Sequence, residues 1–246
     1  YLHNYRQLDI NYAGAVEFQL RREQVILCPQ TVTFLYDAFT PLQVRYQKGL
    51  RPQLEQVVAT ITAGCDTERE RVLALMRFCR DLRKQPGPNW DNYIYGGTEE
   101  QMIAKPEILC ETLGRLMVAL CEVNGIPGRI IMHDLGGHIV SEIYVEGSWA
   151  YIDPRCGLYF LKSDGNFASL QDLCRDASII GNQPDAVKAD VSDQWTWSFR
   201  AWKVENMYCN KNEVNGFQNY SLADSGAYDF SQVPRRTAEA NGLMTI

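Results

Sequence analysis

Hydrophobic residues recur at helical spacing along the first half of the chain. Residues 52–62 and 67–84 each carry an apolar stripe with the 3.6-residue period, and Gly64 separates the two. Thr67 and Glu70 match the capping-box pattern that starts many helices. The pattern therefore predicts two amphipathic helices, each packed on the rest of the protein by one face.

A third helical pattern covers residues 108–123 and ends at 124–125, where Asn-Gly is a typical helix stop. Pro106 and Glu107 suit the start of this helix, because proline lacks an N–H there without loss and a carboxylate favours the positive end of the helix dipole. Cys110 therefore falls within the first turn of the predicted helix.

Three strand-like runs follow at residues 129–133, 138–145 and 148–152. Consecutive short runs favour an antiparallel meander. A helix followed by such a meander predicts an α+β fold, in which the helix packs on an antiparallel sheet.

Glu146-Gly147 has the composition of a two-residue hairpin turn between the last two runs. Such a turn pairs Val145 with Ser148. Because side chains alternate faces along a strand, this register places His138 and Asp153 on the same face of the sheet.

The two ends of the chain differ from this central part. Alternating residues predict a small N-terminal β element, with strands at 16–20, 24–28, 31–35 and 42–46. Beyond Pro154 the pattern is irregular, with one helix predicted at 169–176 and loops after Asn206. We therefore divide the chain into an N-terminal β extension at 1–50, a core at 51–160, and a loop-rich C-terminal part of the same domain at 161–246, which holds an aromatic cluster.

Composition narrows the class of protein. With 46% hydrophobic and 22% charged residues, the chain resembles a globular domain rather than a disordered segment. Its net charge of −6, without a run of Lys or Arg, argues against nucleic acid or an anionic membrane as a partner. No apolar stretch approaches the ~20 residues of a membrane span. The eight cysteines form no CxxC pair, which argues against a zinc knuckle.

Cys110, His138 and Asp153 are the residue types of a thiol acyl-transfer site. The N–H groups and dipole at a helix start stabilise a thiolate at Cys110. His138 would take the thiol proton, and the carboxylate of Asp153 would hold the ring in the required tautomer. The structural alternatives are a small buried cysteine, a surface histidine on a strand and an Asp-Pro turn.

Other residues compete for roles in this site. His133 is an alternative base, and Cys156 either lines the site or belongs to the core. His133 and Asp134 lack further ligands at useful spacing, so no catalytic metal is expected.

The oxyanion donor has several candidates as well. Trp90, Tyr95 and Gln101 precede the nucleophile, but the backbone N–H of Cys110 is the preferred donor. For the tryptophans of the aromatic cluster, core packing is preferred over a substrate platform.

Three ordered motifs resemble the transglutaminase-like superfamily, which has a papain-like fold. Cys110 at a helix start precedes Gly-Ile-Pro-Gly-Arg at 125–129 with the spacing of that family. Gly-His-Ile-Val-Ser-Glu-Ile-Tyr-Val at 137–145 resembles the family's His-x-x-x-Glu-Val strand. Gly-Ser-Trp-Ala-Tyr-Ile-Asp-Pro at 147–154 resembles its Gly-x-Trp-x-x-x-Asp-Pro strand.

The resemblance covers about residues 67–157 and implies that Cys110, His138 and Asp153 form a catalytic triad. The chain departs from the family at Ile108, where glycine is usual, and at Ile139, where an aromatic residue is common. Both positions lie where substrate would approach, which leaves the substrate class open.

The activity implied by the resemblance is cysteine-dependent acyl transfer on amide bonds of a protein or peptide, through a thioester and without a cofactor. Hydrolysis by a peptidase or amidase is expected, because many members of the family are hydrolases. A glutamine transglutaminase with an amine acceptor and a catalytically idle binding module are the alternatives. A peptide:N-glycanase-like amidase shares the triad, but it would usually carry paired CxxC motifs, which this sequence lacks.

The cytoplasm is the expected compartment, and secretion is the alternative if a signal segment preceded Tyr1. The oligomeric state is open.

Overall fold

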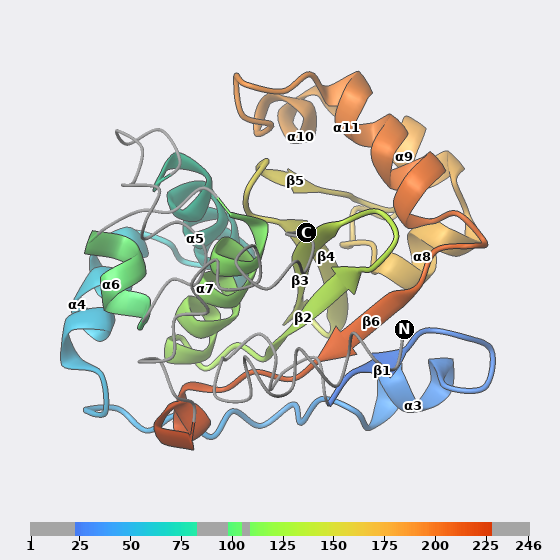
Figure 1. Cartoon of the computed structure of the whole chain (residues 1–246). Coiled ribbons are helices and arrows are strands. Elements are labelled where there is room, and N and C mark those ends of the chain that lie inside the picture. Colours follow the sequence, from blue (N-terminus) through green and yellow to red (C-terminus); the bar gives the residue numbers. More distant parts are fainter. Residues whose placement is uncertain (1–22, 83–97, 105–108, 228–246) are drawn as a thin grey trace, which may run out of the picture.

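The computed structural model describes residues 23–82, 98–104 and 109–227 (Figure 1). Within this part of the chain a six-stranded sheet has the spatial order β1-β6-β2-β3-β4-β5, with all neighbours antiparallel. The strands are β1 (Val25–Ile26), β2 (Gly128–His133), β3 (His138–Val145), β4 (Ser148–Asp153), β5 (Leu158–Tyr159) and β6 (Asn215–Gln218). The helices are α3 (Val32–Asp37), α4 (Pro52–Ile61), α5 (Glu68–Leu82), α6 (Glu99–Ala104), α7 (Cys110–Val123), α8 (Leu170–Arg175), α9 (Ser178–Gly181), α10 (Asp185–Ala189), α11 (Trp197–Lys203), the π-helix η2 (Val204–Tyr208) and the 3-10 helix η3 (Leu222–Ala227).

The sheet is covered on both faces, which gives the protein two hydrophobic cores (Figure 1). On one face α4, α5, α6 and α7 pack on side chains that include Ile130 and Ile143. On the other face α8, α9 and η2 pack on side chains that include Ile131 and Val140. Neighbouring residues serve different cores because side chains alternate along a strand. Nearly every residue of β2, β3 and β4 is therefore buried.

The predicted α+β fold with a helix packed on an antiparallel sheet is confirmed. The predicted helices at 52–62, 67–84 and 108–123 correspond to α4, α5 and α7 within the described residues, and the predicted meander is β2, β3 and β4. The capping box also forms, since Glu70 N–H donates to Oγ1 of Thr67 at 3.1 Å and Thr67 N–H donates to Oε2 of Glu70 at 2.9 Å.

The predicted hairpin register between β3 and β4 is confirmed as well. Val145 pairs with Ser148. Both turn residues have positive φ, 53° at Glu146 and 81° at Gly147, which is the conformation that a two-residue type I′ turn requires.

The N-terminal segment differs from the β element predicted for it. Residues 32–35 lie in helix α3 rather than in a strand, with Thr31 as the N-cap of that helix, and 42–46 form neither helix nor strand. The Cys28 N–H donates to Oγ1 of Thr31 at 3.0 Å, and this local bond favours a turn leading into α3 over the strand preference of Thr31 and Val32. Of the strand predicted at 24–28 only Val25–Ile26 is strand, and 16–20 lies outside the described residues.

The segment beyond Pro154 is more regular than its sequence pattern predicts. The predicted helix at 169–176 is α8, with Ser169 as its N-cap. The pattern does not predict α9, α10 or α11, because helices of 4, 5 and 7 residues are too short to show a period. Residues 215–218 form β6 instead of a loop, and β6 pairs with both β1 and β2.

The division of the chain at 1–50, 51–160 and 161–246 stays a prediction. In the sheet, β6 of the last part lies between β1 of the first part and β2 of the core. This order supports the placement of residues 161–246 in the same domain as the core.

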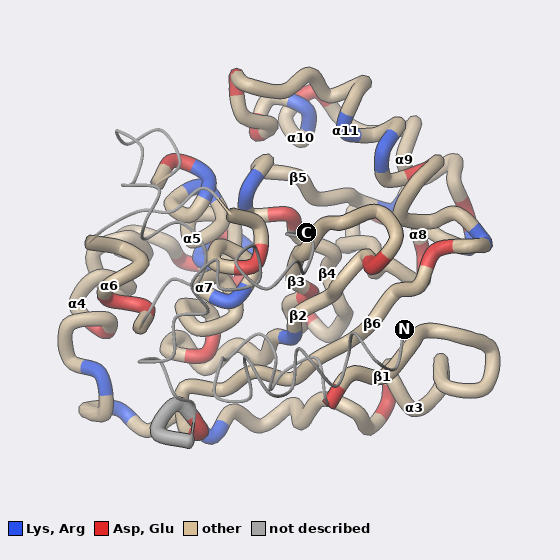
Figure 2. The backbone as a smooth tube through the Cα atoms, viewed as in Figure 1, with Lys and Arg blue, Asp and Glu red and all other residues tan. Residues whose placement is uncertain are grey.

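Charged residues of both signs are interspersed along the described chain (Figure 2). Within these segments Lys and Arg form no long run of the kind that phosphate backbones select. Among the described residues, no helix combines the length and the apolar character that a membrane crossing needs.

Candidate active site

Cys110 is the first residue of α7, where a thiolate is favoured. The preceding Leu109 is extended, with φ −77° and ψ 145°, so the helix and its unpaired N–H groups begin at Cys110. α7 packs on β3, and this contact brings Cys110 to His138 at the start of that strand.

Gly114 allows α7 to approach β3 closely. A Cβ atom at this position would lie 3.4 Å from Cγ2 of Ile139 and 3.4 Å from the carbonyl oxygen of Val140. A small residue one turn after Cys110 thus sets how near the thiol comes to the strand.

His138 and Asp153 are joined by a hydrogen bond across β3 and β4. Nε2 of His138 lies 2.7 Å from Oδ2 of Asp153, and both side chains are buried. The second carboxylate oxygen, Oδ1, accepts the backbone N–H groups of Arg155 at 3.1 Å and Cys156 at 3.3 Å. The fixed carboxylate selects the ring tautomer with a proton on Nε2, which leaves Nδ1 for the thiol of Cys110.

The surroundings of Cys110 favour its thiolate. Burial raises the pKa of the thiol, but the hydrogen bond and the charge of His138 lower it. The backbone N–H of Ile139 and the charge of Arg155 act in the same direction. The pKa of Cys110 is therefore lowered from its ordinary value.

The other described cysteines separate the effect of burial from that of hydrogen bonding. Burial raises the pKa of Cys79, Cys121 and Cys156, so these thiols stay protonated at neutral pH. At Cys28 the pKa is lowered, first by a hydrogen bond with the Thr31 side chain. A low pKa alone does not single out Cys110, whereas its contact with an imidazole does.

His138 and Asp153 are both shifted towards their charged forms. Burial lowers the pKa of His138, but the charge and hydrogen bond of Asp153, followed by those of Cys110, raise it above its ordinary value. Burial raises the pKa of Asp153, but the charges of His138 and Arg200 hold it far below its ordinary range. The carboxylate is thus ionised at neutral pH, and its charge favours the protonated form of His138.

Arg200 belongs to this site, although the sequence pattern does not reveal it. Its Nη2 donates to Oδ2 of Asp153 at 2.7 Å and lies 3.2 Å from Nε2 of His138. It comes from α11, in the segment for which the sequence predicts only aromatic packing. One signal in the sequence could have indicated this role. Arg200 lies among the aromatic residues of 195–202, and an arginine buried among aromatic side chains needs a hydrogen-bond acceptor.

His133, the alternative base, has both ring nitrogens occupied. Nδ1 lies 2.6 Å from Oδ1 of Asn215, and Nε2 lies 3.1 Å from the hydroxyl of Tyr151. Burial lowers the pKa of His133 to about 3. Its ring stacks on that of Tyr208, which also faces His138, with centroid distances of 4.2 and 5.5 Å. His133 therefore forms a neutral layer behind His138.

Of the side-chain candidates for an oxyanion donor, Gln101 is the one that lies in the described structure. Gln101 is exposed on α6, and its Oε1 accepts the N–H of Thr98 at 2.8 Å at the start of that helix. Cys156, for which the sequence leaves a place at the site or in the core open, is a core residue whose backbone N–H donates to Oδ1 of Asp153. The remaining sequence candidates lie outside the described residues: Trp90, Tyr95, and the helix-start residues Pro106, Glu107 and Ile108.

The aromatic cluster divides between core and surface. Trp197 packs against both hydrophobic cores, and Trp195 packs against the one that contains η2. Trp195 also stacks on Phe199, with ring centroids 5.9 Å apart. Phe199 and Trp202 are exposed, so core packing accounts for only part of this cluster.

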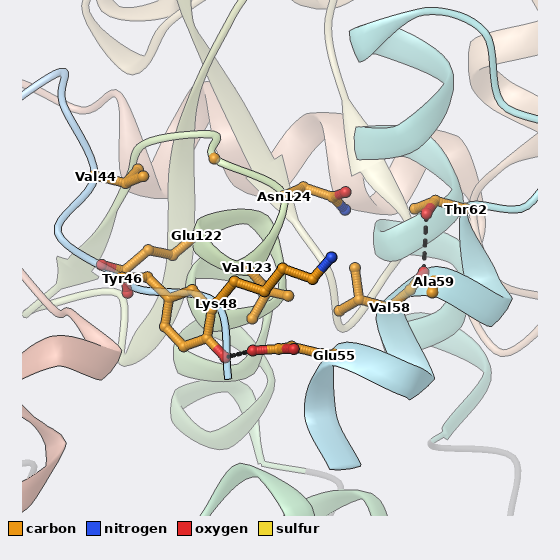
Figure 3. A pocket seen from close by; sticks show the side chains of 11 residues that line it. Val44, Tyr46, Lys48, Glu55, Val58, Ala59, Thr62, Glu122, Val123 and Asn124 are labelled. Atoms are coloured by element: carbon orange, nitrogen blue, oxygen red, sulfur yellow. Dashed lines mark hydrogen bonds between the residues drawn. The ribbon is translucent and has the colours of Figure 1, made fainter. Parts of the chain in front are cut away.

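A cavity of about 530 Å³ lies at the opposite end of α7 (Figure 3). Its walls include Glu122, Asn124 and Tyr46, together with side chains of α4. At a rise of ~1.5 Å per residue, the 14 residues of α7 place this cavity about 20 Å from Cys110. The cavity is thus separate from the site of Cys110.

Comparison with known families gives one match. The core model of the transglutaminase-like superfamily matches residues 55–154, which hold Cys110, His138 and Asp153 but not Arg200. No curated protein and no solved structure matches the chain significantly. The superfamily comprises cysteine-dependent acyltransferases and hydrolases. The chain therefore carries a transglutaminase-like core over residues 55–154.

Proposed function

We propose that this chain is a cysteine-dependent acyl-transfer enzyme that cleaves amide bonds of a protein or peptide. Cys110 is the nucleophile, His138 is the base and acid, and Asp153 orients His138. The observation that carries the proposal is the hydrogen-bonded order of these three side chains at the start of α7.

The directions of the pKa shifts support the same roles. The pKa of Cys110 is lowered and that of His138 is raised, both against the effect of burial. Shifts in these directions favour a thiolate–imidazolium pair over a neutral thiol and a neutral imidazole. Such a pair supplies both the attacking atom and the proton for the leaving group.

In the first half of the reaction, the thiolate of Cys110 attacks the carbonyl carbon of the amide. The carbonyl oxygen becomes an oxyanion, and the backbone N–H of Cys110 is its proposed donor. The intermediate then collapses as the C–N bond breaks and His138 gives its proton to the leaving amine. The acyl group remains on Cys110 as a thioester.

In the second half, water attacks the thioester while His138 takes one of its protons. The C–S bond breaks, a carboxylic acid leaves, and the protonated ring again faces the thiolate of Cys110. We propose water as the acceptor because it needs no binding site of its own, whereas a transamidase must bind an amine of a second molecule. Transamidation is the alternative outcome for the same thioester.

A peptide library that contains backbone amides and glutamine side-chain amides tests the proposal. Mass spectrometry in the presence of a primary amine distinguishes acid products from amine adducts. The wild-type chain is expected to release acid products, and Cys110→Ala is expected to release none. Turnover that survives in Cys110→Ala overturns the proposal, and amine adducts as the main product replace hydrolysis with transamidation.

A further inference from the structure

Arg200 meets the carboxylate of Asp153 through a single nitrogen. Nη2 of Arg200 is 2.7 Å from Oδ2 of Asp153 and 3.2 Å from Nε2 of His138. Because Nε2 carries the proton that His138 donates to the same Oδ2, two donors converge on one oxygen. The contact between Nη2 and Nε2 is then a close approach of two donors, which brings the guanidinium charge against the ring.

This geometry differs from that of Arg129 and Glu142, a buried ion pair in the same sheet. Arg129 directs Nε and Nη2 to one oxygen of Glu142, at 2.9 and 2.6 Å. Arg200 is also enclosed, with 3% of its surface exposed, yet its Nε has no hydrogen-bond partner among the described residues. Arg200 thus contacts only Oδ2 of Asp153, the oxygen that also accepts from His138.

Titratable groups face His138 from several elements packed around β3. They are Cys110 of α7, Asp153 of β4, His133 of β2, Tyr208 of η2 and Arg200 of α11. Burial keeps His133 neutral and raises the pKa of the Tyr208 hydroxyl. Within this set, Arg200 is therefore the group whose positive charge opposes protonation of the ring.

We propose that Arg200 is a positioning residue of the site, which shares Oδ2 of Asp153 with His138 and opposes the positive charge of the protonated ring. The proposal deepens the function proposed above and rests on it for its catalytic meaning. An imidazolium opposed by a nearby cation is a stronger acid, so it gives its proton more readily to a leaving amine. The segment beyond the transglutaminase-like core thus completes the site, because α11 must be docked for Arg200 to reach Asp153.

NMR titration of the His138 ring tests the proposal directly. The chain has three histidines, so His3→Gln and His133→Gln variants assign the signals. Arg200→Met and Arg200→Gln remove the charge, whereas Arg200→Lys keeps it. Loss of the nearby cation favours the protonated ring, and Oδ2 of Asp153 is then left to His138 alone, so the pKa of His138 is expected to rise by about one unit in the neutral variants and to stay near wild type in Arg200→Lys. An unchanged pKa in the neutral variants overturns the proposal.

Two control variants separate this effect from a loss of packing. Arg129→Gln breaks a buried arginine pair away from the ring, and Lys203→Gln removes a cation from the same helix as Arg200. Both are expected to leave the pKa of His138 nearly unchanged. A shift as large in these controls as in the Arg200 variants also overturns the proposal.

A measurement on the wild-type chain covers the case in which the neutral variants do not fold. The guanidinium NMR signal of Arg200 is expected to shift in step with the titration of His138, and a signal that ignores this titration contradicts the proposal. Neither NMR measurement requires turnover. If the chain proves inactive, the proposed function is wrong, but the NMR measurements still show whether Arg200 acts on the ring of His138.

Discussion

The ring of His138 and the carboxylate of Asp153, 15 residues apart in the sequence, meet at 2.7 Å across the hairpin of β3 and β4. The turn at Glu146 and Gly147 sets this contact, because a shift of one residue in the register would turn one of the two side chains to the opposite face of the sheet. The candidate site therefore depends on a turn at the far end of the hairpin.

Gly147 should be sensitive to substitution for this reason. Its φ of 81° is strained for a residue with a Cβ atom, and most strongly for a β-branched one. We expect Gly147→Val to lower the free energy of unfolding by ~1–2 kcal/mol, as measured by urea denaturation. Glu146→Asn is the control, since asparagine tolerates positive φ and gives up only the partly exposed ion pair with Arg69, so it should cost less than Gly147→Val. Equal stability of the valine variant and the wild type would contradict the assigned turn.

Asp153→Asn should affect both turnover and stability. The amide can no longer fix the ring tautomer, and we expect turnover of the amide substrate to fall by about 10³–10⁴. It also leaves the buried Arg200 without its charged partner, which should cost about 3–5 kcal/mol of unfolding free energy. The double variant Asp153→Asn with Arg200→Met should recover stability but not turnover. A single variant with near wild-type turnover would remove Asp153 from the proposed site.

Gly114 should tolerate alanine but not leucine. An added Cβ only reaches contact distance, 3.4 Å from Ile139 and from the Val140 carbonyl, and alanine also favours the helix. A leucine must push α7 away from β3, which should cost about 1–3 kcal/mol and slow the alkylation of Cys110 as the thiol moves from His138. Rates of alkylation and urea midpoints measure both effects. Unchanged alkylation in Gly114→Leu would show that the thiol does not depend on this approach.

His133 should make the protein sensitive to acid. Its pKa is about 3 in the folded chain and near 6.5 when exposed, so between these values the unfolded chain binds the proton. The neutral, buried His133 therefore contributes its full share of the free energy of unfolding above about pH 6.5. This share is lost as the pH falls, by about 2 kcal/mol between pH 7 and pH 5. His138, with its raised pKa, has the opposite sign, and its contribution is fully present below the unfolded pKa. Urea unfolding at pH 7 and pH 5 should show a smaller loss in His133→Gln, and an equal loss in both proteins would contradict the account.

Much of the central fold follows from local signals in the sequence. The capping box of Thr67 and Glu70 and the turn at Glu146 and Gly147 each involve residues close in the chain. Their geometry depends little on distant packing, so sequence reasoning places α5 and the β3–β4 register correctly. That register is what brings His138 and Asp153 together.

Features that depend on tertiary contacts could not be predicted in the same way. Residues 31–35 have a strand-like composition, but a local hydrogen bond at Thr31 and the burial of Leu35 favour a helix. Arg200 becomes part of the site only because α11 docks near the end of β4, and no spacing in the sequence encodes that contact. The short helices beyond Pro154 carry too few residues to show a hydrophobic period.

The pH dependence of Cys110 alkylation tests the central claim most directly. The measurement uses iodoacetamide and peptide mapping in a Cys28→Ser background, because Cys28 is another described cysteine with a lowered pKa. We expect Cys110 to react well below the pH at which an ordinary thiol ionises. His138→Gln should move the reaction of Cys110 to higher pH, because burial raises the pKa of the thiol and the imidazole that lowers it is gone. The same profile with and without the imidazole would contradict a thiolate–imidazolium pair between Cys110 and His138.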